Sequence, residues 1–338
     1  MSRQSNFELL RILAMLFVLI LHATYSVFDY PKGHLVQAAP FSWLGIILTA
    51  QATVCAVNTF VLITGWFGTH LKWTNLLRLV FQVLFYCVLI TLGVYLLKGE
   101  RHSLKEFAQS LTSYWFVSSY LLLYLLSPIL NAFIAQSDER TLRRYLIGWY
   151  IVTIPLSLVG TELAEGYSAL SFVGLYLLGR YLRLYGASRL ANLPHKRFLQ
   201  LFLINTFGLG GIAWVYFCVK PAHFPNPTLI LMSYTSPFVI LNAVCLILYF
   251  SRLHLQSKVI NWLAAGSFAA YLTHQQLFVR SDYFETIRTL SLSLSTPIFI
   301  LAAAGVILTI FLLSASIDHC REWIWIKVLH HVNGIKDR

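Results

Sequence analysis

Apolar runs long enough to cross a bilayer recur along the whole chain, and they restrict its fold more than any other feature. Hydrophobic residues make up 58% of the 338 residues and charged residues only 11%, whereas a soluble domain carries about 25% charged residues. We therefore predict an all-α polytopic membrane helix bundle of about ten spans. The predicted spans are 7–28, 43–67, 76–97, 115–134, 145–160, 169–184, 198–217, 229–250, 259–279 and 297–316.

The distribution of basic residues predicts how these spans are oriented. With the N-terminus inside, 18 of the 25 Lys and Arg residues fall on the inner side and the other seven on the outer side. This bias favours an N-in, C-in topology. Topology also accounts for the net charge of +12, so we do not expect a nucleic acid as a partner. The five cysteines form no CxxC pair, so we expect neither a disulfide framework nor a metal site.

The predicted spans divide the chain into two regions. Residues 1–316 form the expected transmembrane domain, embedded in a lipid bilayer. Residues 317–338 form a basic cytoplasmic tail, which is either solvated or lies as a helix on the inner membrane surface. The outer connections 98–114 and 280–296 are expected to be loops.

Two residues that can carry charge lie within the first apolar run. Arg11 and His22 are eleven residues apart, which is close to three helical turns, so they share a face about 16 Å apart along the axis. Glu8 lies on the same face, one turn before Arg11. Ionisable groups within a span are costly and normally face a protein interior or a wet cavity, so we favour a functional role over simple burial.

Other polar residues form stripes on the predicted spans. Span four carries Tyr120, Tyr124, Ser127 and Asn131 after its first residue, Trp115. Span two carries Gln51, Asn58 and Gly65, and span nine carries Ser267, Tyr271 and His274. Each stripe alone is explained by hydrogen bonds between helices. His22 and His274 each lie about 15 residues into a span that runs from inside to outside, so both are predicted near the outer leaflet. Together with these two histidines, the stripes favour a wet cavity.

Four basic residues lie near the predicted inner ends of spans three and six. Lys72 and Arg78 flank the start of span three, and Arg180 and Arg183 end span six, one turn apart. Topology alone explains basic residues at this level. The alternative is an anion site for a cytoplasmic ligand that carries phosphate, because Arg binds phosphate with two parallel hydrogen bonds.

These elements resemble the integral-membrane acyltransferase family 3, specifically its branch of bacterial surface-polysaccharide O-acetyltransferases. The resemblance runs in order from about residue 6 to residue 279. Three departures from the family pattern stand out: Thr64 replaces the usual serine, the basic inner loop that follows is thinner and holds only Lys72 and Arg78, and Gln275 stands where members often carry an acidic residue. The matching elements are Glu8 with Arg11 and His22, Thr64-Gly65-Trp66-Phe67, Tyr114-Trp115-Phe116, Leu175 to Arg183, and Tyr271-Leu272-Thr273-His274.

The resemblance implies a multi-pass enzyme of the bacterial inner membrane that moves an acetyl group from cytoplasmic acetyl-CoA to a sugar hydroxyl of a surface or lipid-linked polysaccharide. No metal is implied. We assign catalysis to His22, as base or as transiently acetylated group, with Arg11 oriented by Glu8. The proposed CoA-phosphate ligands are Lys72, Arg78, Arg180 and Arg183, and the proposed acceptor ligands are Asn58, Trp115, Tyr120, Tyr271 and His274.

Two other interpretations remain open at this point. A transporter or flippase of lipid-linked glycans would carry out no acyl transfer and would not depend on acetyl-CoA. A different kind of membrane O-acyltransferase, with a late catalytic histidine, would place His274 rather than His22 at the reacting centre.

Overall fold

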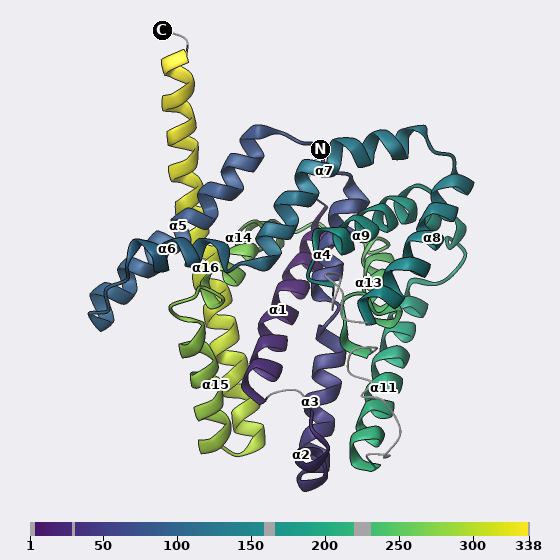
Figure 1. Ribbon diagram of the computed structural model, residues 1–338, viewed down its shortest axis with the longest axis horizontal. Helices are drawn as coiled ribbons and strands as arrows, with labels where there is room; N and C mark the ends of the chain where they lie inside the picture. Colours follow the sequence, from purple (N-terminus) through teal and green to yellow (C-terminus); the bar gives the residue numbers. More distant parts are fainter. Residues whose placement is uncertain (1–3, 29–30, 159–165, 220–230, 337–338) are drawn as a thin grey trace. The chain divides into compact units, whose positions relative to one another are not determined.

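The chain folds almost entirely into α-helices in the computed structural model, which describes residues 4–28, 31–158, 166–219 and 231–336 (Figure 1). Six of the described helical segments are long and apolar enough to cross a membrane, and the apolar helix Pro237–Phe250 is shorter. The prediction of an all-α polytopic membrane protein is confirmed, whereas the N-in, C-in orientation stays a prediction. The six segments are Ser5–Tyr25, Pro40–Phe67, Trp73–Lys98, Trp115–Gln136, His195–Val219 and Thr296–Leu329.

The predicted spans outside these six segments are helical as well. Several helix boundaries differ from the predicted ones. The predicted span 43–67 is divided between α3 (Pro40–Thr53) and α4 (Ala56–Phe67). The two connections expected to be loops contain the helices α6 (Leu104–Thr112) and α15 (Arg280–Ser293). The predicted span ends at 160 and 229 lie outside the described residues.

The last helix, α16, runs from Thr296 to Lys336 and continues beyond the predicted span end at residue 316. The tail is therefore helical as far as residue 336, and its last two residues lie outside the described part of the chain. Its place on the inner membrane surface stays a prediction.

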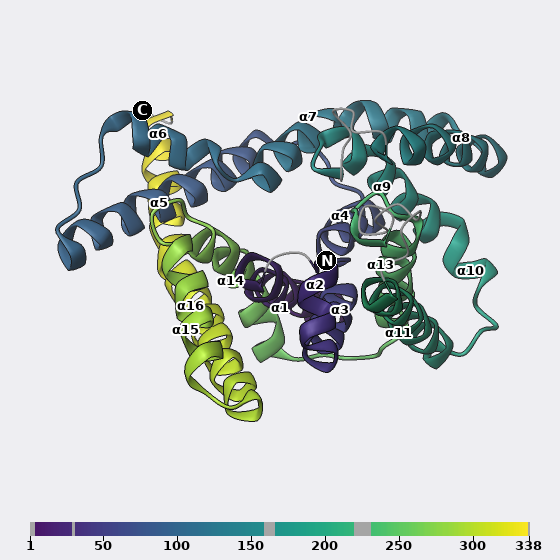
Figure 2. The ribbon, with the colours of Figure 1, turned by 60° about the horizontal axis from the view of Figure 1, so that its bottom comes forward.

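The helices form two compact units. The first combines residues 1–19, 71–115 and 256–338. It contains the first turns of α1 (Ser5–Phe28), together with α5 (Trp73–Lys98), α6, α14 (Lys258–His274), α15 and α16. Helix α14 packs closely on α16, because a Cβ added at Gly266 would lie 2.6 Å from the backbone oxygen of Ala315. Helices α15 and α16 lie side by side in both ribbon views (Figures 1 and 2).

The second unit combines residues 20–70 and 116–255. Its best-packed pair is α4 with α9 (Ala169–Tyr181), where glycines face each other's backbones. A Cβ added at Gly179 would lie 2.5 Å from the backbone oxygen of Leu62. Small residues at such crossings let membrane helices approach closely. The other elements are the end of α1, α2 (Gly33–Ala38), α3, α7 (Trp115–Gln136), α8 (Glu139–Leu158), a π-turn (Leu182–Gly186), α10 (Ala187–Arg189), α11 (His195–Val219) and α13 (Pro237–Phe250).

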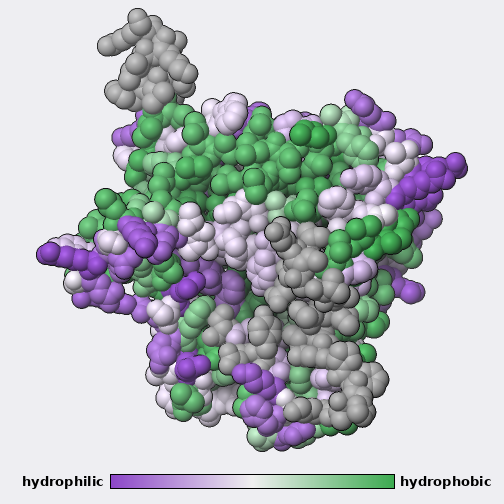
Figure 3. All heavy atoms as spheres, in the orientation of Figure 1, coloured by the Kyte–Doolittle hydropathy of each residue, from purple (hydrophilic) through white to green (hydrophobic). Residues whose placement is uncertain are grey.

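Much of the apolar surface faces outward, as expected of helices in contact with lipid. On α5, the side chains of Leu92, Leu96 and Leu97 are all more than half exposed. Figure 3 shows apolar side chains covering large parts of the face that it views. In water such a surface would be unstable, so the exposed side chains agree with the membrane class that the composition predicts.

Candidate functional site

Glu8, in the first turn of α1, forms an ion pair with Arg11 one turn further along the helix. The Oε1 atom of Glu8 lies 2.6 Å from Nη1 of Arg11. Glu8 is buried, whereas about a third of the Arg11 side chain is exposed. The spacing of three residues predicts this contact. Glu8 therefore fixes the guanidinium of Arg11 on the face of α1 where that side chain remains accessible.

His22 lies on the same continuous helix, and its side chain is half-buried. Because α1 runs unbroken from Ser5 to Phe28, helical geometry puts Arg11 and His22 on one face, about 16 Å apart along the axis. The helix thus carries a cationic group near one end and a titratable imidazole near the other, as the sequence predicts.

His274 is the last residue of α14, and its side chain is only 2% exposed. Its Nδ1 atom lies 2.6 Å from the backbone oxygen of Ala270. Because a carbonyl oxygen can only accept, this contact assigns the hydrogen to Nδ1 and leaves Nε2 as the acceptor of the neutral ring. The edges of Tyr271 and Tyr283 meet the imidazole, with ring centres 6.1 and 5.4 Å away. The hydrogen bond and the two aromatic contacts together hold the His274 ring in one orientation.

Tyr271 and Trp115, both predicted to bind the acceptor, belong to the first unit. Tyr271 is buried and packs against Tyr114, with ring centres 5.8 Å apart. The hydroxyl of Tyr114 donates a hydrogen bond of 2.8 Å to the backbone oxygen of Leu272. Trp115 follows directly as the first residue of α7 and is half-buried. The Tyr-Trp and Tyr-Leu-x-His elements of the sequence are thus joined through Tyr114.

Asn58 and Tyr120 belong to the second unit. Asn58 is fully buried, and its amide nitrogen donates to the backbone oxygen of Tyr234 at 2.8 Å. Its amide oxygen has no hydrogen-bond partner among the described residues. Tyr120 is half-buried, stacks on Phe116 and lies 3.4 Å from the hydroxyl of Thr64. Within the described part of the chain, Asn58 is therefore left with an unused acceptor oxygen, while Tyr120 joins α7 to α4.

Arg180 and Arg183 surround Trp66 at the end of α4. Arg180 donates to the backbone oxygen of Trp66 at 3.3 Å, and the guanidinium of Arg183 lies 5.4 Å from the centre of its ring. Gly68, with a φ of +70°, follows, and a Cβ there would meet the Arg180 guanidinium at 2.9 Å. Among the described residues, no carboxylate pairs with either arginine. Their charges remain open to an anion.

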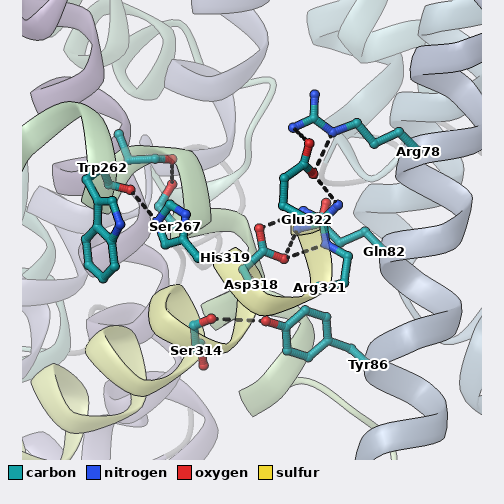
Figure 4. A network of polar contacts seen from close by, with 11 residues as sticks. Arg78, Gln82, Tyr86, Trp262, Ser267, Ser314, Asp318, His319, Arg321 and Glu322 are labelled. Carbon is teal, nitrogen blue, oxygen red and sulfur yellow. Dashed lines mark hydrogen bonds and ion pairs between the residues drawn. The ribbon is translucent and has the colours of Figure 1, made fainter. Parts of the chain in front are cut away.

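Arg78 belongs to a network of polar contacts between α5 and α16 (Figure 4). Its guanidinium contacts both carboxylate oxygens of Glu322, at 2.9 and 2.5 Å. Glu322 also accepts from Arg321, which in turn pairs with Asp318 at 2.7 Å. Arg78 is therefore already paired with a carboxylate, unlike Arg180 and Arg183. Lys72, which begins α5 as its N-cap, is exposed.

The polar stripe of α7 holds the connection between α4 and α5. The hydroxyl of Tyr124 donates to the backbone oxygen of His70 at 2.9 Å, and Asn131 donates to that of Thr69 at 2.7 Å. Tyr176 of α9 donates to the amide oxygen of Asn131 at 2.7 Å. This stripe therefore fixes a loop. A wet cavity is not needed to explain these residues.

The sequence interpretation missed Gln82, Asp318, Arg321 and Glu322. Asp318 and Arg321 are only 2% and 3% exposed, although the sequence predicts a tail there that is solvated or lies on the inner membrane surface. Their spacing of three residues is compatible with a helical ion pair. The contact of Asp318 with Gln82 joins positions 236 residues apart, which no local pattern predicts.

The fold and these residues together define a multi-pass helical membrane protein whose first helix carries an ion-paired arginine and a half-buried histidine. The chain belongs to acyltransferase family 3, because the model of that family, described as an acyltransferase domain, matches residues 4–315. The protein is therefore a membrane acyltransferase by family. A search of curated proteins and a search of solved structures found no similar chain.

Proposed function

We propose that this protein is an O-acetyltransferase of a bacterial inner membrane, which moves an acetyl group from cytoplasmic acetyl-CoA to a sugar hydroxyl of a surface or lipid-linked polysaccharide. The observation that carries the proposal is α1, on which Glu8 holds Arg11 and a half-buried His22 lies three turns away. The family match supports acyl transfer in general. The donor and the acceptor are part of the proposal.

His22 is the proposed catalytic residue because a sugar hydroxyl is a poor nucleophile at neutral pH and needs a base that titrates there. In direct transfer, the ring takes the hydroxyl proton as the sugar oxygen bonds to the thioester carbonyl carbon. The carbon–sulfur bond then breaks, and the ring returns the proton to the CoA sulfur. In the covalent alternative, the ring nitrogen bonds to the thioester carbon and the carbon–sulfur bond breaks, so that CoA leaves as its thiolate. The sugar oxygen then bonds to the same carbon, the nitrogen–carbon bond breaks, and the hydroxyl proton goes to the CoA thiolate or to water. The half-buried side chain favours His22 over His274, which is almost fully buried.

Arg11 is proposed to stabilise negative charge on the donor, either on a phosphate or on the thioester oxygen as the sugar attacks. Glu8 would hold the guanidinium in place for this role, since the two side chains are 2.6 Å apart. Replacing Arg11 by Ala should weaken binding of acetyl-CoA, and unchanged donor affinity would make Arg11 a structural residue.

The CoA phosphates are proposed to bind at Arg180 and Arg183 in preference to Arg78. The first two have no carboxylate partner among the described residues, whereas Arg78 must exchange Glu322 for the ligand. Lys72 is exposed and adds a further positive charge. This ranking predicts that Arg180→Ala raises the KM for acetyl-CoA more than Arg78→Ala does.

The acceptor is proposed to contact Asn58, Trp115, Tyr120, Tyr271 and His274. Sugars bind through a few placed hydrogen-bonding groups and through apolar ring faces. The amide oxygen of Asn58, which has no hydrogen-bond partner among the described residues, can accept from a sugar hydroxyl, and the half-buried ring of Trp115 can cover a sugar face.

The test is the loss of glycan O-acetylation in cells that produce His22→Ala at normal membrane levels, measured by NMR of the isolated polysaccharide. The matched control is His254→Ala, which removes an exposed histidine from the connection before α14. We expect acetylation to be lost with the first variant and kept with the second. Full acetylation with His22→Ala would refute the assignment, and loss with His274→Ala alone would move the reacting centre to α14.

A further inference from the structure

An open apolar groove of about 720 Å³ runs along α8 in the second unit. On α8 it is lined from Arg143 through Ile147 and Ile151 to Pro155, and on α9 by Leu178 and Tyr181. The α8 residues recur every three or four positions, so they form one stripe of that helix. From Arg143 to Pro155 the stripe is about 18 Å long, which is close to the roughly 15 Å of one leaflet's hydrocarbon layer.

Among the described residues that line the groove, Arg143 alone carries a charge, and it lies at one end of the groove. Among the described residues it has no ion-pair partner, although other charges nearby are compensated. Glu139 pairs with Arg189 at 2.6 Å. Arg140 and Arg144 are attracted electrostatically to the carboxylate of Asp138. The end of the groove therefore presents one uncompensated guanidinium beside an apolar channel.

Tyr150 adds a second feature to the wall of the groove. Its hydroxyl is buried and has no hydrogen-bond partner among the described residues. An unpaired buried hydroxyl is unfavourable in an apolar environment and is a good position for an acceptor oxygen of a bound molecule. Tyr150 lies two helical turns from Arg143 along α8, within the apolar stripe.

We propose that this groove is a binding site for one anionic phospholipid, with its phosphate on Arg143 and an acyl chain along Ile147 and Ile151. Anionic phospholipids all carry a phosphate attached to long apolar chains. This combination matches a single cation at the end of an apolar channel. Basic pockets between membrane helices bind the head groups of anionic lipids for this reason. Zwitterionic lipids carry their own cation beside the phosphate and should bind less well.

Native mass spectrometry of the full chain in detergent tests the charge, with dioleoyl phosphatidylglycerol and dioleoyl phosphatidylcholine as probes. We expect the intact protein to retain the anionic lipid at least about fivefold more tightly. Arg143→Gln should remove that preference. Arg144→Gln, which removes the same charge from an exposed position outside the groove, should keep it. Equal retention of both lipids, or equal losses with the two variants, would overturn the proposal.

A second pair of variants tests the channel. Ile151→Trp fills the groove and should weaken retention of both lipids, whereas Ile204→Trp on α11 should not. Ile204 is a matched control for Ile151, because the two side chains are almost equally exposed, at 68% and 66%. Competition by free glycerol 3-phosphate would show a site for soluble anions instead of a lipid site. A shift to the mass of a dimer that Ile151→Trp abolishes would show an interface between copies of the chain. Either result would overturn the proposal.

Discussion

Asp318→Asn should destabilise the protein strongly, because it breaks a buried ion pair and leaves the other charge in place. Asp318 accepts from Arg321 at 2.7 and 3.0 Å and from Gln82 at 2.8 Å. Both charged side chains are at most 3% exposed. Removing one partner of a buried pair costs about 3–5 kcal/mol. Glu322 still contacts Arg321 at 2.7 Å and compensates part of its charge. We therefore expect a loss of unfolding free energy at the lower end of this range, about 3 kcal/mol.

The measurement is the free energy of unfolding in mixed micelles of a mild detergent and a denaturing one. Arg321→Met should cost a similar amount, since it leaves a buried carboxylate. The double variant Asp318→Leu/Arg321→Met removes both charges and should lie within about 1 kcal/mol of the intact protein. The control Asp282→Asn breaks an exposed pair with Lys98 and should leave the stability unchanged. A cost below about 1 kcal/mol for Asp318→Asn, or a double variant less stable than either single variant, would show that the buried ion pair does not stabilise the fold in this way.

Three further predictions concern helix packing and the proposed donor site. Glu322→Gln should lower the KM for acetyl-CoA severalfold by releasing Arg78, and an unchanged KM would exclude Arg78 as a donor ligand. Gly179→Ala should sharply reduce the thermal stability because the new Cβ meets a backbone oxygen at 2.5 Å, whereas Gly208→Ala enters open space and should not; equal melting temperatures would argue against this packing. Asn131→Ala should speed proteolysis of the loop that it holds, and unchanged cleavage would show that the loop is fixed otherwise.

The sequence predicts the helices well where one physical signal dominates. Long apolar stretches identify the membrane-crossing helices, since only a helix satisfies its backbone in lipid. The break between α3 and α4 falls at Val54 and Cys55, where no Gly or Pro marks it. Helix α15 is missed because it is too polar to be recognised as a span. Its polar residues, such as Asp282 and Arg288, are typical of a loop, although the segment forms a regular helix.

The candidate site is predictable only where its contacts are local. The pairing of Glu8 with Arg11 follows from a spacing of three residues on a helix. The partner of Arg78 does not, because Glu322 is 244 residues away in the sequence. Likewise, the stripe on α7 shows which face of that helix is polar. It does not show the partners, which are backbone oxygens of Thr69 and His70 in the connection between α4 and α5.

His22 is proposed to activate the acceptor of an acetyl group donated by acetyl-CoA. The most direct test of this role is transfer of label from acetyl-CoA to polysaccharide by the purified protein in liposomes, with intact protein, His22→Ala and His254→Ala compared at equal amounts. We predict labelled polysaccharide with the intact protein and the control, and a rate about 100- to 10,000-fold lower with His22→Ala, the usual contribution of a general acid–base group. Equal rates for all three proteins would exclude this role of His22, and no acetyl transfer by the intact protein would exclude the proposed reaction.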